Sequence, residues 1–86
     1  MIYKRGKMLV NVTEADIDNG VPANGLSCPI ALAVHRLFPY RYVSVYGGQV
    51  HLDRSAHLLL PFRAISFYRD FDNGKTVNPF KFYLEV

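Results

Sequence analysis

The only cysteine of the chain, Cys28, lies in a segment whose pattern predicts the start of a helix. A thiol at a helix N-terminus can become a nucleophile, because backbone N–H groups and the helix dipole stabilise the thiolate. Catalysis would also need an acid or base, but His35 lies further along the same helix, roughly 10 Å away at the helical rise per residue. No pattern links Cys28 to His51 or His57. We therefore interpret Cys28 as a small buried residue and predict no enzymatic activity.

His51, Asp53 and His57 lie close together in the sequence, and their side chains are of types that bind metal ions. His51 and Asp53 would share one strand face. A mixed set of three without a second cluster is more typical of a solvated strand edge and loop, so we predict neither a metal site nor any other cofactor. Gly47-Gly48 lacks the glycine-rich pattern of a phosphate-binding loop.

Local signals mark the first strand and the first helix. Residues 8–12 alternate between apolar and polar side chains, as strands do. Thr13-Glu14-Ala15-Asp16 resembles a capping box, which predicts one or two helical turns over residues 13–19. Residues 1–7 contain three basic side chains and are expected to form a loose tail, so that residues 8–86 make up a single domain.

The second predicted helix contains the cysteine. It begins at Cys28 or Pro29, because proline is favourable in a first helical turn and Ser27 can cap the helix from outside. Pro39 ends it.

Two strands, at 42–46 and 49–53, are joined by Gly47-Gly48, which is typical of a tight hairpin. Their buried face would comprise Val43, Val45, Val50 and Leu52. Their open face would comprise Tyr42, Ser44, Tyr46, Gln49, His51 and Asp53.

The pattern of residues in the last part of the chain predicts a helix and a strand. Residues 58–61 lead into a helix over 62–72, with Phe62 among the side chains of its apolar face. Residues 80–86 alternate most regularly, with the even-numbered positions directed inward.

The resulting order, β-α-β-β-α-β, predicts the α+β class. For so short a chain we expect one four-stranded antiparallel sheet with two helices on one face, the ferredoxin-like arrangement. A meander of the four strands is the alternative. Either arrangement leaves one sheet face open.

Composition limits the classes of protein that the chain can belong to. Its 86 residues, of which 50% are hydrophobic, predict one domain with a substantial core. A lone cysteine and the lack of a long apolar segment predict a cytoplasmic protein without membrane contact, in the host cytoplasm if a phage encodes it. Six Phe and six Tyr exceed what a small core needs, which favours a homo-oligomer.

The open sheet face is the strongest candidate for a binding surface. Tyr42, Tyr46, His51 and Tyr83 are expected there, together with Lys81. Tyrosines interleaved with basic side chains suit a protein interface or a platform on which nucleic-acid bases stack. The element order resembles that of the RNA-recognition motif, but the aromatic pattern of that family is missing.

Charge adds a weak preference for anionic partners. The net charge of +3 is far below that of a dedicated DNA-binding protein. The arginines expected to contact an anion are Arg36, Arg41, Arg54 and Arg63.

Three groups of motifs, taken together, resemble small uncharacterised proteins of bacteriophages and bacteria. The matching residues are Val12–Ile17 with Gly20, Cys28-Pro29-Ile30-Ala31-Leu32-Ala33 with Arg36, and Phe71-Asp72-Asn73-Gly74 with Pro79-Phe80. The resemblance implies no particular activity. It implies a context in which small accessory proteins act by binding, as inhibitors of host enzymes, blockers of immune complexes or sponges for nucleotide signals.

Two functions follow as hypotheses. The first is a non-enzymatic, oligomeric binding protein that inhibits a host defence protein or sequesters an anionic nucleotide signal. The alternative is a nucleic-acid-binding accessory protein that uses the tyrosine-rich sheet face.

Overall fold

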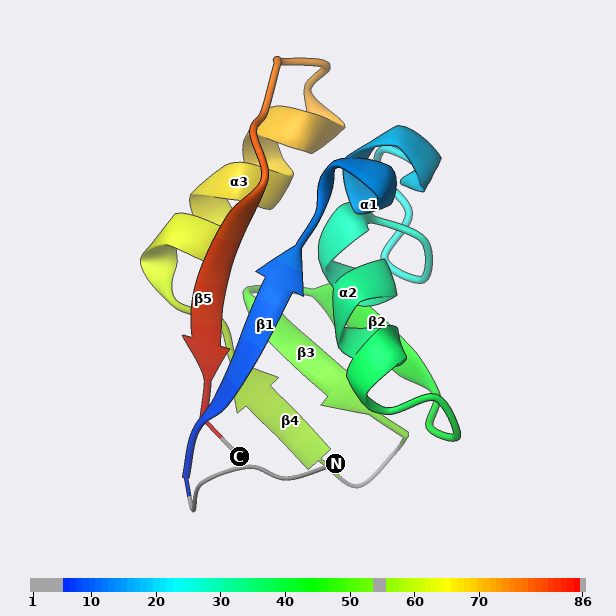
Figure 1. Cartoon of the computed structure of the whole chain (residues 1–86), viewed down its shortest axis with the longest axis vertical. Helices are drawn as coiled ribbons and strands as arrows, with labels where there is room; N and C mark the ends of the chain where they lie inside the picture. Colours follow the sequence, from blue (N-terminus) through cyan, green and yellow to red (C-terminus); the bar gives the residue numbers. More distant parts are fainter. Residues whose placement is uncertain (1–5, 54–55, 86) are drawn as a thin grey trace.

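Eight short elements follow one another along residues 6–53 and 56–85, the part of the chain that this computed structural model describes (Figure 1). They are β1 (Met8–Val12), α1 (Glu14–Asn19), α2 (Pro29–Leu37), β2 (Val43–Tyr46), β3 (Gln49–Leu52), β4 (Ala56–Leu59), α3 (Phe62–Asp72) and β5 (Phe80–Leu84). The α+β class is confirmed.

The strands form two antiparallel sheets, so the prediction of one four-stranded sheet was wrong. β1 pairs with β5, placing Val10 opposite Phe82, and β2, β3 and β4 form a separate sheet in that order. β4 occupies the edge of β3 that a single four-stranded antiparallel sheet would have needed for another partner. Figure 1 shows the β1–β5 pair crossing in front of the three-stranded sheet.

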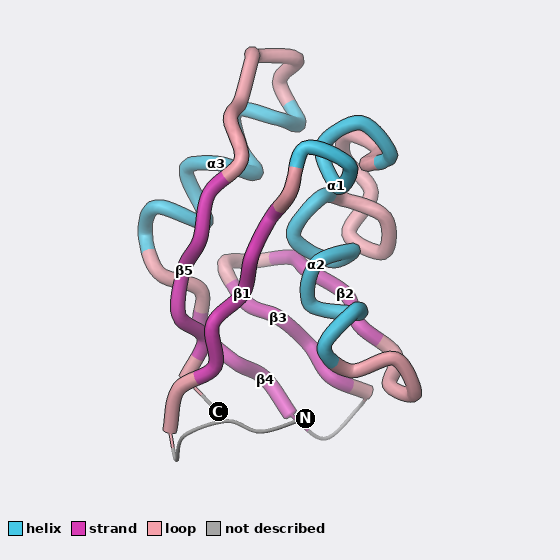
Figure 2. The backbone as a smooth tube through the Cα atoms, viewed as in Figure 1, coloured by secondary structure: helices cyan, strands magenta, loops and turns pink. Residues whose placement is uncertain are grey.

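The strand β4 is the element that the sequence analysis missed. Its Leu58-Leu59-Leu60 run does not alternate between apolar and polar residues, so it was interpreted as a lead into the next helix. In the structure, Leu58 packs against the core whereas Leu59 is 71% exposed, as neighbouring positions of a strand require. β4 pairs antiparallel with β3, and Val50 lies opposite Leu58 (Figure 2).

The predicted signals at helix starts are confirmed for α1 and α2. The Thr13 hydroxyl accepts a hydrogen bond from the Asp16 N–H at 3.2 Å, and the Asp16 carboxylate accepts one from the Thr13 N–H at 2.9 Å. This reciprocal pair is a capping box. α2 begins at Pro29, but its cap is Cys28 and not Ser27 as expected.

The core lies where α2, α3 and the inner faces of both sheets meet. The largest fully buried side chains include Val10, Ile30, Val50 and Leu84, which come from four different elements. In α3, Ala64 and Phe67 are buried, but Phe62 is 79% exposed, which contradicts its expected inward position. Phe62 precedes the buried Ala64 by two residues, about 200° around the helix, so it lies on the opposite side from the buried face.

The hairpin between β2 and β3 forms as predicted. Gly47 and Gly48 have φ angles of 61° and 75°, the left-handed conformations that a tight primed turn requires. Val43, Val45, Val50 and Leu52 all face the core, as the alternation predicted.

Candidate functional site

Cys28 serves as a structural cap within the core. Its side chain is buried, and its Sγ accepts a hydrogen bond from the Ala31 N–H at 3.4 Å. Burial raises the pKa of the Cys28 thiol, and the opposing hydrogen bonds from backbone N–H groups do not cancel this effect. The group is therefore a protonated thiol at neutral pH, which is a poor nucleophile.

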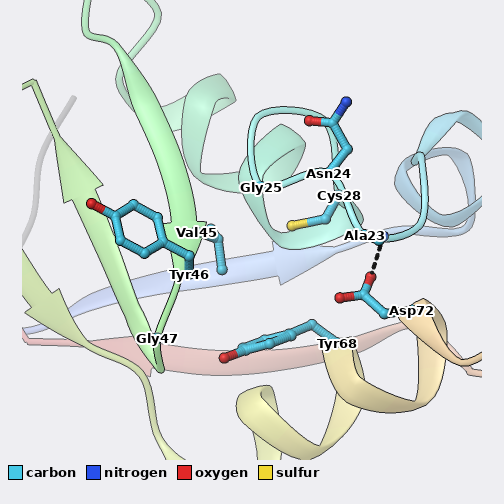
Figure 3. A pocket seen from close by; sticks show the side chains of 9 residues that line it. All are labelled: Ala23, Asn24, Gly25, Cys28, Val45, Tyr46, Gly47, Tyr68 and Asp72. Carbon is cyan, nitrogen blue, oxygen red and sulfur yellow. Dashed lines mark hydrogen bonds between the residues drawn. The ribbon is translucent and has the colours of Figure 1, made fainter.

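A small hollow of 210 Å³ adjoins Cys28 between the loop at 23–25, β2 and α3 (Figure 3). Figure 3 shows the Cys28 sulfur directed into this hollow, while the Tyr46 ring points away from it. The Ala23 N–H donates a hydrogen bond of 2.8 Å to Asp72 at one side. None of the nine described residues that line the hollow is a histidine, so the thiol has no imidazole base beside it.

Arg36, one of the expected anion contacts, is paired with Asp16. Two guanidinium nitrogens donate to the two carboxylate oxygens at 2.9 and 2.8 Å, and one also donates to the Asn11 carbonyl at 3.0 Å. Burial alone would raise the pKa of Asp16, but hydrogen bonds from Arg36 and Thr13 outweigh it and lower that pKa. The guanidinium is thus neutralised by a carboxylate of its own chain.

Arg41 is also paired, in this case with Asp53. The Asp53 carboxylate accepts a hydrogen bond of 2.8 Å from the Tyr42 N–H and another from the Arg41 side chain. The bond from Tyr42 and that from Arg41 both lower the pKa of Asp53. Arg54 lies outside the described residues.

The face of the three-stranded sheet that points away from the core carries a row of aromatic and imidazole rings. Tyr46 stacks on His51 with ring centroids 4.0 Å apart and planes 9° from parallel, and His57 meets His51 edgewise at 4.6 Å. Tyr42 and Tyr46 are about 60% exposed, as expected. Ser44 and His51 were expected to be open, but their neighbours on this face bury them.

Tyr83 does not belong to that face. It lies on β5, in the other sheet, directly opposite Leu9 of β1. The single tyrosine-rich surface expected from the sequence is therefore divided between two sheets.

A second surface gathers around Tyr83. Leu9, Pro61, Arg63, Lys81, Phe82 and Tyr83 line an open hollow of 740 Å³, which we call the Arg63–Lys81 hollow. No carboxylate lines it among the described residues, and neither cation forms an ion pair with a residue described here. The Arg63 guanidinium lies over the Phe80 ring, 5.6 Å from its centroid, which holds the side chain in place.

The apolar surface continues beyond this hollow. A neighbouring hollow of 380 Å³, lined by Leu59, Leu60, Pro61, Tyr83 and Glu85, shares two residues with it. Leu59 and Phe62 are exposed by 71% and 79%. Neither residue is predicted to be exposed from the sequence, because the periodic patterns place apolar side chains on a buried face. The one available signal was Pro61, which marks Phe62 as the first residue of its helix.

Comparison with known proteins adds no assignment. No protein-family model matches the chain, and neither a curated protein nor a solved structure is significantly similar to it. Within residues 6–53 and 56–85, no helix has the length and apolar character needed to cross a membrane. The same part of the chain has no group of three or more His, Cys, Asp or Glu side chains placed to hold a metal ion.

Proposed function

We propose that this protein is a non-catalytic binding protein that captures an acidic partner protein at the Arg63–Lys81 hollow. The observation that carries the proposal is the meeting of two unpaired cations with exposed Leu9 and Tyr83 in one hollow lined by no described carboxylate. A partner surface with carboxylates beside apolar side chains would complement both features.

The start of α3 strengthens the positive potential of this hollow. Pro61 and Arg63 line the hollow, so the N-terminal end of α3 lies at its rim. This end has no acidic residue in its first turn and no side-chain cap. The helix dipole therefore adds partial positive charge where the two cations already lie.

A partner protein fits this surface better than a free nucleotide. Sites for small molecules usually enclose most of the ligand, whereas the side chains here stand in an open hollow. Leu9 is 45% and Tyr83 is 59% exposed. Tyrosine and arginine, both present in the hollow as Tyr83 and Arg63, are among the side chains enriched at the centre of protein interfaces.

The biological setting of the proposal comes from the resemblance to small phage and bacterial proteins. We propose that the partner is a host protein, such as a component of a defence system, and that binding blocks its activity. Sequestration of an anionic nucleotide is the weaker version of this proposal, because Arg36 and Arg41 are each paired with a carboxylate.

The test compares capture by three forms of the protein. The immobilised wild type, the hollow variant Arg63→Glu/Lys81→Glu and the control variant Arg69→Glu/Lys75→Glu are exposed to the same host lysate, and the retained proteins are quantified. The two variants change net charge equally. We expect at least one host protein to bind wild type and control but to lose about tenfold or more in affinity for the hollow variant. Equal retention by all three forms would contradict the proposal.

Salt and nucleic-acid probes separate this function from the alternative. The exposure of Tyr42 and Tyr46, and the stacking of Tyr46 on His51, are the observations that favour nucleic acid. In a retardation assay at low salt we expect no shift of single- or double-stranded probes, because Arg41, which adjoins Tyr42, is paired with Asp53 and does not replace counterions there. A shift that weakens steeply with added salt would favour the nucleic-acid-binding function.

A further inference from the structure

His51 is the unusual residue on the outer face of the three-stranded sheet. Its side chain is buried, with 7% exposed, and its Nε2 atom has no hydrogen-bond partner among the described residues. Within those residues it is the only buried side-chain nitrogen or oxygen in this state. Buried polar groups are nearly always satisfied, so this atom requires an explanation, and a bound water or ion is one that supplies the missing partner.

A second imidazole lies where it could share a ligand with His51. His57 of β4 is directly opposite His51 of β3 in the strand register, and their ring centroids are 4.6 Å apart. Two imidazoles that bind one zinc ion through Zn–N bonds of about 2.1 Å have ring centroids roughly 5 Å apart. The observed centroid separation is close to that value, and the His57 ring would have to turn from its present edgewise contact, in which the ring planes are 65° apart.

The two rings differ in freedom in a way that suits metal binding. Tyr46 stacks on His51 at 4.0 Å and fixes the orientation of that ring. His57 is exposed, so its side chain can rotate to direct a nitrogen toward the Nε2 atom of His51. The orientation of the His51 ring is thus fixed before an ion binds, and the His57 side chain can rotate to coordinate the ion.

We propose that His51 and His57 together bind one divalent transition-metal ion, with water at the remaining positions. Imidazole favours Zn²⁺, Cu²⁺ and Ni²⁺ over hard cations such as Mg²⁺. The site is independent of the Arg63–Lys81 hollow. Asp53, the third ligand type considered from the sequence, does not take part because Arg41 and the Tyr42 N–H occupy its carboxylate.

The test titrates the full-length chain, without an affinity tag, with ZnCl₂ and NiCl₂ by isothermal calorimetry, and with MgCl₂ as the hard-cation control. We expect binding of Zn²⁺ and Ni²⁺ but not of Mg²⁺. The matched variants are His57→Gln, His51→Gln and His35→Gln, the last of which removes an exposed histidine from α2. Removing a ligand should weaken binding by about tenfold or more, while His35→Gln should bind as wild type does.

His57→Gln is the decisive variant, because an exposed residue can be replaced without disturbing the core. Circular dichroism would verify that His57→Gln is folded. A separate spectrum of His51→Gln would show whether that variant, which changes a buried residue, is also folded. Zn²⁺ binding that persists unchanged in folded His57→Gln would overturn the proposal. Failure of the wild type to bind Zn²⁺ or Ni²⁺ would overturn it as well.

Discussion

At the scale of single residues, Asp16 connects α1 to α2. It closes the capping box of α1, pairs with Arg36 of α2 and is 4% exposed. A carboxylate so buried is tolerated because hydrogen bonds and a cation compensate for the lost water. Because the Arg36 guanidinium is paired with Asp16, it does not offer an unpaired positive charge to an anionic ligand.

We expect Asp16→Asn to lower the free energy of unfolding by about 2 kcal/mol at pH 7, because hydrogen bonds to charged groups typically contribute about 1.5–3 kcal/mol. Urea denaturation measures the difference. Asp18→Asn, on the exposed side of α1, is the control and should change stability little.

The same variant has an expected pH dependence. The pKa of Asp16 is lowered in the folded chain, so the stabilisation is present above the unfolded pKa of about 3.9 and is lost as pH falls through the folded pKa. The difference between wild type and Asp16→Asn should therefore shrink in acid. If it kept its full size at about pH 2.5, the charge of Asp16 would not be its cause.

At the scale of elements, the loop between α1 and α2 is attached to the three-stranded sheet. The Val45 N–H donates a hydrogen bond of 2.8 Å to the Gly25 carbonyl. A Cβ atom at Gly25 would lie 2.5 Å from the Val45 carbonyl oxygen, closer than any side chain can approach. The absence of a side chain at residue 25 therefore allows the loop to pack against β2 and form one wall of the hollow beside Cys28.

We expect Gly25→Ala to destabilise the protein by about 1–3 kcal/mol, the range of a steric clash with packed backbone. Ala23→Gly, two residues earlier, is the matched comparison. Ala23 has a φ of 55°, a conformation that costs an L-residue about 1–2 kcal/mol, so glycine there should be neutral or stabilising. Thermal unfolding of both variants measures the contrast, and equal melting temperatures would show that the loop is not tightly packed.

At the scale of the whole molecule, the three tyrosines expected on one sheet face lie on two separate surfaces. Tyr46 lies on the three-stranded sheet and Tyr42 directly precedes its strand β2, whereas Tyr83 lies at the Arg63–Lys81 hollow. Two copies facing each other through that hollow would bring like charges together, which disfavours self-association there. The homo-oligomer therefore remains a prediction for the sheet face.

Single substitutions can separate the two surfaces. We expect native mass spectrometry of the wild type to show species heavier than the 9.8 kDa chain. Tyr46→Ala should shift the mass toward one chain and leave host-protein capture intact, because its ring lies on the sheet face. Tyr83→Ala should weaken host-protein capture and leave the native mass unchanged. If both variants altered assembly and capture alike, the two surfaces would not act independently.

The sequence by itself determined the features that depend on residues close together in the chain. The capping box at Thr13 and Asp16, the start of α2 at Pro29, the turn at Gly47-Gly48 and the alternation along β5 are all local. Each is set by backbone conformation and hydrogen bonds within a few residues, so residue type is enough to predict it.

Only the tertiary structure decided which distant parts meet. The division into two sheets, the pairing of β4 with β3 and the exposure of Phe62 all depend on how the elements pack. The arginines also show that long-range packing decides pairing. Arg36 forms an ion pair with Asp16, twenty residues away in the sequence, whereas Arg63 forms no ion pair within the described chain. Periodicity assigns a side chain to a face but does not identify its partner, which long-range packing selects.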